Sequence, residues 1–242
     1  MNMIASRLSV TRKRTSAEFA AAFTLMEVLA VLGLMVALSA FLVGRLGGIN
    51  RSASLKSAQA LVANLVGLAR TKAVASGQSC RILWQVDPLG DGESRRYLRY
   101  MVVQLQTAGG WQTVTDAFLP DGVYVVPGNF AALPSGLFAF TAAVPWTKVD
   151  GTDLRSTALR SNQISSETIN GIDSEQWVSI VFSSFGTTLQ SGDIVMGLGH
   201  RRAPGTYGLD GAPIELDPPA AVRGLTLSAY GLPTLINSRT SF

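Results

Sequence analysis

The sequence predicts an α+β protein in which a long N-terminal helix packs against an antiparallel β-sheet head. Three observations predict this fold: an apolar run from Phe23 to Val43, an amphipathic pattern from Leu55 to Ala73, and β-rich segments from Cys80 onward. The length of 242 residues allows one good-sized domain plus an appendage. We therefore expect four regions: a basic leader (1–22), an apolar helix (23–46), an amphipathic helix that continues into the head (47–76), and the β-rich head (77–242).

The positive charge of the chain is concentrated in the leader. The basic residues there outnumber the single acidic residue, Glu18, and they are Arg7, Arg12, Lys13 and Arg14. Beyond Gly77 there are 14 acidic and 11 basic residues, so the head is near −3 although the chain has a pI of about 9.5. A head of this balance lacks the broad cationic face that phosphate backbones require, which disfavours nucleic acid as a partner.

The apolar run is long enough to cross a membrane. Phe23 to Val43 would span about 32 Å as a helix, which matches the hydrocarbon core of a bilayer. The basic cluster at 12–14 outweighs Arg45 on the other side of the run. The positive-inside rule therefore predicts a single-pass protein with a cytoplasmic N-terminus and an exported head.

Glu27 is unexpected at the start of this run, because a carboxylate in a membrane helix costs a few kcal/mol unless it has a partner. The run could be a cleaved signal that uses the small residues of Ala37–Ala40, but signal h-regions are normally shorter. It could also be a plain signal anchor, which would give Glu27 no role. The third interpretation, that the carboxylate has a function in this helix, explains its presence.

The stretch "AFTLMEVLAVLGLMVAL" (22–38) resembles the N-terminus of type IV pilins and type II secretion pseudopilins. In that family a prepilin peptidase cuts on the cytoplasmic side, between a small residue and phenylalanine, and the new N-terminus is methylated. The resemblance implies cleavage between Ala22 and Phe23 and N-methylation of Phe23. Glycine is usual before the cut, so Ala22 departs from the family pattern, and we expect slower processing at most.

Glu27 falls at the fifth mature position, where the family has its glutamate. The resemblance implies that Glu27 acts in assembly by pairing with the N-terminal amine of a neighbouring subunit. The physics agrees, because an amine on Phe23 and a carboxylate four residues later lie on the same helix face. Pairing across subunits would relieve the cost of a buried charge and set the axial register.

After the apolar run, three glycines within Gly44–Asn50 predict a bend or a melted turn, since each costs about 1 kcal/mol in a helix interior. The helix should then resume with Lys56, Asn64 and Thr71 on its polar face. Ser76-Gly77 provides a stop, because glycine adopts the left-handed C-cap without strain. The apolar stripe expected to pack on a sheet is Leu55, Ala58, Val62, Leu65, Ala69 and Ala73.

The head is predicted to consist of strands. Cys80, Ile82, Trp84 and Val86 alternate on one face of the first strand. The stretch 127–175 is rich in Gly, Ser and Thr and has weak periodicity, so we expect a surface insertion of long loops with one hairpin. The other predicted strands are 97–106, 111–114, 123–126, 177–182, 193–198 and 224–229.

The order of motifs narrows the resemblance. "LVANLVGLARTKAVASGQSCRILW" (61–84), "LPDGVYV" (119–125) and "VFSSFGTTL" (181–189) resemble H-type pseudopilins and FimT-like minor pilins, and the order also resembles the Verru_Chthon cassette protein D family. This implies a minor, inner-membrane-anchored structural subunit with a periplasmic head. Its implied partners are the prepilin peptidase, other subunits and the inner membrane. The alternative is a minor pilin that acts as a surface binding module, for DNA uptake or adhesion.

Catalytic chemistry is sparse, and we expect no enzyme, no cofactor and no small-molecule substrate. His200 is the only histidine, and its neighbours indicate a solvated loop rather than a catalytic triad. Cys80 alternates with apolar residues, which favours a buried, inert thiol over a nucleophile.

Two charged groups in the head leave alternatives open. Asp87, Asp91 and Glu93 lie in a glycine-rich loop that could hold calcium, as head loops of major pseudopilins do. Their spacing does not match an EF-hand, and a polar hairpin turn explains them equally well, so we expect no metal. Two basic clusters could contact DNA, although solvated charge is favoured. These clusters are Arg95, Arg96 and Arg99, and Arg201 with Arg202.

Overall fold

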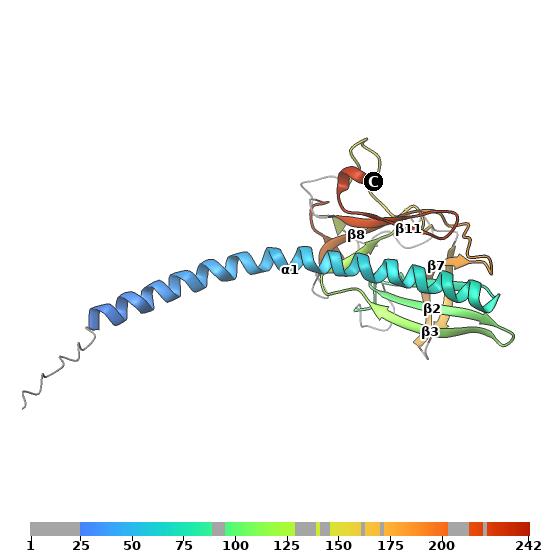
Figure 1. The fold of residues 1–242 in the computed structure, drawn as a ribbon, viewed down its shortest axis with the longest axis horizontal. Coiled ribbons are helices and arrows are strands. Elements are labelled where there is room, and N and C mark those ends of the chain that lie inside the picture. Colours follow the sequence, from blue (N-terminus) through green and yellow to red (C-terminus); the bar gives the residue numbers. More distant parts are fainter. Residues whose placement is uncertain are drawn as a thin grey trace, which may run out of the picture. The chain divides into compact units, whose positions relative to one another are not determined.

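A computed structural model of the chain describes residues 25–88, 95–128, 139–140, 146–160, 163–169, 172–202, 213–219 and 222–242. The chain divides into two compact units, Met1–Leu46 and Gly47–Phe242. The second unit contains the β-rich head together with the C-terminal part of the long helix, so the expected α+β fold is confirmed (Figure 1).

Helix α1 spans Leu25–Ser76 without interruption. Of the two outcomes expected at Gly44–Asn50, the melted turn is wrong, because the helix continues through this segment. Glycine lowers the stability of a helix but does not block helical dihedral angles. The predicted stop is confirmed, since Gly77 adopts a φ of 66°. This left-handed conformation lets the chain leave the helix and enter the first strand within three residues.

The predicted stripe of α1 is buried in the core of the second unit. Leu55, Ala58, Val62, Leu65, Ala69 and Ala73 are at most 7% exposed. Lys56, Asn64 and Thr71 are exposed, as predicted. Gln59 is also buried, at 2% exposed, although its polarity gave no reason to expect this. The helix thus buries one apolar face and a single amide against the strands.

The first sheet has five strands in the order β3-β2-β1-β7-β6, and all neighbours are antiparallel. Side chains of β1 alternate as predicted: Cys80, Ile82 and Trp84 join the core that contains the helix stripe, while Leu83 belongs to a second cluster. The strand bounds are β1 Cys80–Gln85, β2 Tyr100–Thr107, β3 Gly110–Phe118, β6 Ile164–Ile169 and β7 Ile172–Phe182.

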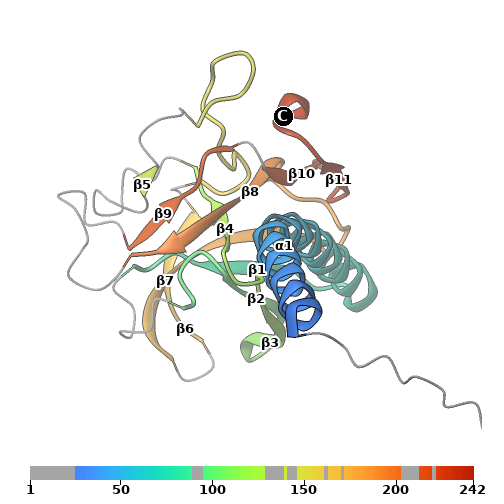
Figure 2. The same cartoon turned by 90° about the vertical axis from the view of Figure 1, so that its left-hand side faces the viewer.

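The second sheet has six strands in the order β11-β10-β8-β9-β5, with β4 also pairing with β8. Only the β5–β9 pair is parallel among the described pairs. Figure 2 shows β1 and β2 on one side of α1 and β10 and β11 on the other. The bounds are β4 Val123–Val126, β5 Ala139–Phe140, β8 Gly192–Arg201, β9 Ile214–Leu216, β10 Arg223–Leu227 and β11 Pro233–Ile236; a 3-10 turn follows at Arg239–Ser241.

Within the described residues, part of the stretch 127–175 is buried, in contrast to the surface insertion that we expected. Its described residues include Trp146, Leu154 and Leu159, which are at most 5% exposed and belong to the main core. The segment is irregular between residues 146 and 160, but it places apolar side chains inside the head. The expected hairpin is present, formed by β6 and the first part of β7.

The second core cluster lies on the first sheet and consists of Leu83, Tyr100, Val102, Ile169 and Trp177. Beside it, Arg81 donates from Nη1 and Nη2 to the two carboxylate oxygens of Glu167, at 2.9 and 3.1 Å. Its guanidinium lies 4.3 Å from the centre of the Trp111 ring. An arginine on a central strand is therefore buried with a bidentate partner and an aromatic cover.

Candidate functional site

The N-terminal part of α1 presents apolar side chains around its whole circumference. All side chains described between Leu25 and Val36 are exposed. They include Leu25 (79%), Met26 (81%) and Leu34 (62%). A helix that is apolar all round is normally covered by lipid or by other protein, because exposing it to water is unfavourable. Among the described residues, no helix offers an apolar window of the length and hydropathy needed for a membrane crossing.

Glu27 lies in the first turn of α1, where a carboxylate interacts favourably with the helix dipole. It is exposed within the single chain, and its neighbours Met26 and Val28 are exposed as well. Its side chain therefore lies on the exposed apolar surface of the helix. The predicted cleavage and methylation positions, Ala22 and Phe23, lie outside the described residues.

Cys80 is a buried, free thiol, as predicted. Burial raises the pKa of Cys80 to about 11, against smaller opposing effects of a backbone hydrogen bond and the charge of Lys72. The thiol is thus protonated at neutral pH and closed to reagents. It packs with the helix stripe in the main core, so its role is structural.

His200 does not lie in a loop, and that expectation is wrong. It occupies β8, opposite Glu215 on β9, and its side chain is 55% exposed. Its ring nitrogens lie 3.9 Å from Glu215 Oε2 and 3.6 Å from Asp217 Oδ1. The neighbours of His200 suggested a loop, but at Gly199 a side chain would collide with the Glu215 carbonyl oxygen on β9. This glycine thus allows the close approach of β9 within the sheet.

Of the three candidate calcium ligands, only Asp87 lies within the described residues. Its Oδ2 accepts a hydrogen bond from the backbone N–H of Gln176 at 3.3 Å. Asp91 and Glu93 fall outside the described residues. Within the described part of the chain, no group of three or more potential metal-ligating side chains comes together. The structure thus gives Asp87 a role in linking the end of β1 to β7.

The two basic clusters meet at one cavity. Arg95 and Arg99 approach it from the turn before β2, and His200 and Arg201 from the end of β8. The cavity has a volume of about 580 Å³, and its other lining residues are Asp121, Gly122, Tyr124 and Gly199. The sequence showed two clusters about 100 residues apart, and it carried no signal that they converge.

The expectation that these charges are simply solvated is wrong for part of the set. Arg99 is 9% exposed, and its Nη2 donates to the Leu119 carbonyl oxygen at 2.8 Å and to Asp121 Oδ1 at 2.6 Å. Arg96 pairs with the buried Glu175 at 3.5 Å, and Arg202 pairs with Glu215 at 3.4 Å. Arg96 and Arg202 therefore serve internal ion pairs.

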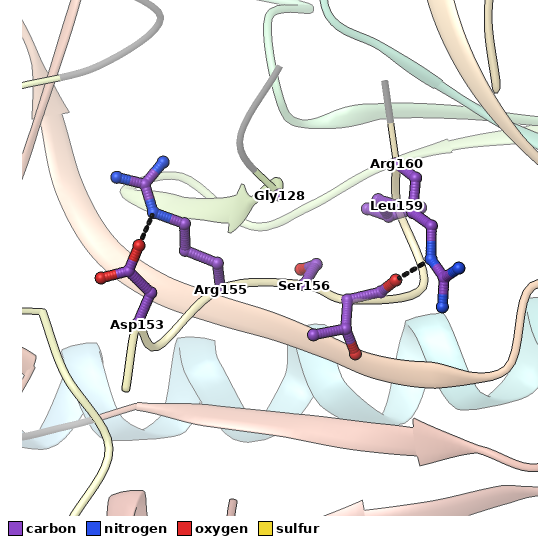
Figure 3. A pocket seen from close by; sticks show the side chains of 7 residues that line it. Gly128, Asp153, Arg155, Ser156, Leu159 and Arg160 are labelled. Carbon is purple, nitrogen blue, oxygen red and sulfur yellow. Dashed lines mark hydrogen bonds and ion pairs between the residues drawn. The ribbon is translucent and has the colours of Figure 1, made fainter. Parts of the chain in front are cut away.

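A second cavity of about 410 Å³ lies beside Gly128 and the segment from Asp153 to Arg160 (Figure 3). Its charged groups are engaged by their own neighbours. Arg155 Nε lies 3.6 Å from Asp153 Oδ2, and Arg160 Nε donates to the Thr157 carbonyl oxygen at 2.9 Å. These contacts stabilise the irregular segment and give no reason to assign it a ligand.

No protein-family model matches the chain, and no curated protein matches it. Among solved structures, the chain resembles a type IV minor pilin and a minor pseudopilin. One is the type IV minor pilin FimU of Pseudomonas aeruginosa, with 10% identity and a TM-score of 0.35 over 75% of this chain and 87% of that chain. Another is the minor pseudopilin EpsH of Vibrio cholerae, with 12% identity and a TM-score of 0.37 over 76% of this chain and 97% of that one.

Proposed function

We propose that this protein is a minor pseudopilin or pilin-like structural subunit. Its N-terminal helix anchors it in the bacterial inner membrane with the head in the periplasm, and the subunit then joins a filament of the type II secretion or type IV pilus kind. The leader 1–22 is removed by prepilin peptidase, which leaves a methylated Phe23.

The observation that carries this proposal is the apolar surface of α1 between Leu25 and Val36, interrupted by Glu27. Nine large apolar side chains there are between 47% and 81% exposed in the single chain. Such a surface is unfavourable in water and favourable in lipid or against other helices of the same kind. Membrane anchoring followed by helix packing in a filament covers it in both stages.

Several charged and polar groups of the head stabilise the head itself, which supports a structural role. Arg81 with Glu167, Arg96 with Glu175 and Lys148 with Asp193 each form internal ion pairs. Gln59 binds two strand carbonyls. The Gln59 contacts hold the C-terminal part of α1 within the head, and in the proposed filament the N-terminal part of the same helix contacts lipid and neighbouring subunits.

Intact mass and N-terminal sequencing of the membrane-extracted protein test this proposal. Coexpression with a prepilin peptidase should give a chain that begins at methylated Phe23. Ala22→Gly should be processed at least as fast, because it restores the usual residue of the family pattern, whereas Ala22→Leu should accumulate the full-length precursor. A mature chain that begins at Met1, or after Ala40, would exclude the pilin-type assignment.

A further inference from the structure

The cavity at the meeting point of the two basic clusters is lined by a tyrosine. Tyr124, on β4, is only 2% exposed as a whole residue. Its hydroxyl is not among the fully buried polar atoms of the described residues that lack a partner, so the hydroxyl retains access to solvent. Because Tyr124 lines the cavity, its hydroxyl can serve as a donor to a ligand bound there.

Positive charges surround this hydroxyl. The Arg99 guanidinium carbon lies 5.9 Å from the centre of the Tyr124 ring. Burial raises the pKa of Tyr124, the charges of Arg99 and Arg201 oppose that rise, and Asp121 adds to it. The hydroxyl therefore stays protonated at neutral pH and is available as a donor.

The backbone fixes the position of these groups. Leu98 adopts a φ of 57°, which is unfavourable for a residue with a side chain, and two backbone hydrogen bonds hold it there. These bonds run from Leu98 N–H to the Gln85 oxygen and from Val125 N–H to the Leu98 oxygen, both at 3.0 Å. Arg99 is thereby set directly against β4. The cavity is thus built on rigid elements.

Arg99 already donates to one carboxylate at the rim of the cavity. Asp121 Oδ1 lies 2.6 Å from Arg99 Nη2, although the Asp121 side chain is 99% exposed. Gly122, with a φ of 76°, closes the turn that carries Asp121 and leaves no side chain over the cavity. A second carboxylate can therefore approach the same guanidinium from the cavity side.

The charge balance distinguishes between classes of anion. Three arginines and one aspartate line the cavity, so the site is locally cationic, whereas the head as a whole is acidic. The cationic groups are confined to the cavity and do not form a stripe that could follow a phosphate backbone. This arrangement favours a single negative group on a partner over an extended polyanion.

We propose that this cavity is a binding site for one carboxylate of an acidic peptide segment from a partner protein. Tyr124 donates its hydroxyl to one carboxylate oxygen, and Arg95 and Arg99 provide the positive charge. The site goes beyond the filament role proposed above, because it gives the head a specific contact that does not depend on the N-terminal helix.

Saturation-transfer NMR with the full chain in zwitterionic detergent tests the site. The probe is the capped peptide Gly-Gly-Asp-Gly-Gly, and its matched control is Gly-Gly-Asn-Gly-Gly. We expect saturable binding of the aspartate peptide at low salt, in the millimolar range appropriate to one charge-assisted contact, and none of the asparagine peptide. Inorganic phosphate should fail to compete with the aspartate peptide, because the proposed site is specific for a carboxylate. Competition by phosphate would show that the site binds oxyanions in general, which would contradict carboxylate specificity.

Two variants locate the binding. Tyr124→Phe removes only a hydroxyl that has no described partner in the protein, and Arg95→Gln changes an exposed side chain, so neither should affect folding. Each should weaken binding about tenfold, as expected for a hydrogen bond to a charged group. Tyr230→Phe and Lys56→Gln are matched controls on exposed surfaces and should bind as the unchanged protein does.

Equal binding of the two peptides, or equal affinity of Tyr124→Phe and Tyr230→Phe, would overturn the proposal. A single-stranded DNA oligonucleotide provides the remaining comparison. Binding that strengthens with its length and weakens equally in Arg95→Gln and Lys56→Gln would show a diffuse polyanion surface in place of a carboxylate pocket.

Discussion

Gln59 Nε2, on α1, lies 2.7 Å from the carbonyl oxygen of Gly224 on β10, and the same nitrogen lies 2.8 Å from the carbonyl oxygen of Ile236 on β11. One buried amide therefore binds the helix to two strands of the second sheet. Since the apolar stripe of the same helix joins the main core, the head includes the C-terminal part of α1 as an integral element.

The first prediction concerns the limits of the folded head. A fragment of residues 47–242 should be soluble, monomeric and β-rich by circular dichroism, because the second compact unit begins at Gly47. A fragment of residues 77–242 should aggregate, because it lacks the stripe from Leu55 to Ala73 and exposes the core. Equal solubility of the two fragments would mean that the helix is dispensable to the head.

The second prediction concerns Gln59. Gln59→Ala in the 47–242 fragment should lower the free energy of unfolding by about 2 to 4 kcal/mol, since two strand carbonyls lose a donor in a buried setting. Asn64→Ala, on the exposed face of the same helix, should change it by about 0.5 kcal/mol or less. Urea unfolding followed by tryptophan fluorescence measures both. A Gln59 variant as stable as the Asn64 variant would rule out this bridging role.

The third prediction concerns acid stability. Burial tends to raise the pKa of Glu167, but the hydrogen bonds and charge of Arg81, with a smaller contribution from Ser165, lower it below its ordinary value of 4.5. A lowered pKa in the folded state contributes stability that is present above the unfolded value and is lost as the pH falls through the folded value. Stability should therefore decline below about pH 4.5.

The matched variant for this prediction is Glu167→Gln. It keeps the size of the side chain but removes the charge that partners Arg81, so it should cost about 1 to 3 kcal/mol at pH 7. It should also flatten the decline of stability as the pH falls below about 4.5. Urea unfolding across this pH range provides the measurement. An unchanged slope in the variant would assign the acid sensitivity to other carboxylates.

The fourth prediction concerns Cys80. With a pKa of about 11, its thiolate fraction at pH 8 is about one in a thousand, and burial further blocks access. Iodoacetamide should therefore leave Cys80 unmodified in the folded protein and alkylate it fully in guanidinium chloride. Leu189→Cys, in the turn after β7, supplies an exposed thiol as the control for reagent activity, because Leu189 is 94% exposed. Rapid alkylation of Cys80 under native conditions would contradict its burial in the core.

The sequence predicted the elements whose patterns are strong and local. The helix stripe and the alternation of Cys80, Ile82 and Trp84 are visible in periodicity alone, because each buries one face against the same core. Two edge strands were not placed from the sequence, for a physical reason. β6, with the sequence ISSETI, has few apolar residues, so a hairpin was expected in its stretch without bounds. β11 was missed, and it begins at Pro233, which a sheet tolerates at its edge.

The convergence of the basic clusters could not be predicted, because it depends on pairing between distant strands. The register of β4 with β8 places Val123 opposite Leu198 and thereby brings Tyr124 and Arg99 near Arg201. The burial of Leu154 and Leu159 was missed for the same reason, since their segment has no period of its own. Non-local packing decided both features.

The role of Glu27 in assembly is the central claim, and crosslinking in cells that produce the partner subunits tests it most directly. In the proposed filament, Glu27→Ala leaves a neighbouring N-terminal amine without its partner, a loss of roughly 3 to 5 kcal/mol per interface. Val28→Ala, at the next position on the same exposed helix, is the matched control and keeps the carboxylate. Membrane insertion and cleavage before Phe23 should survive in both variants, because alanine is apolar and the cleavage site lies upstream.

The decisive measurement is the yield of crosslinks from the processed protein to the major filament subunit, normalised to the amount of processed protein in the membrane. The assembly role predicts that this yield is lost in Glu27→Ala and retained in Val28→Ala. If Glu27→Ala crosslinks as efficiently as the unchanged protein, Glu27 is a tolerated charge at the membrane edge and the helix is an anchor alone.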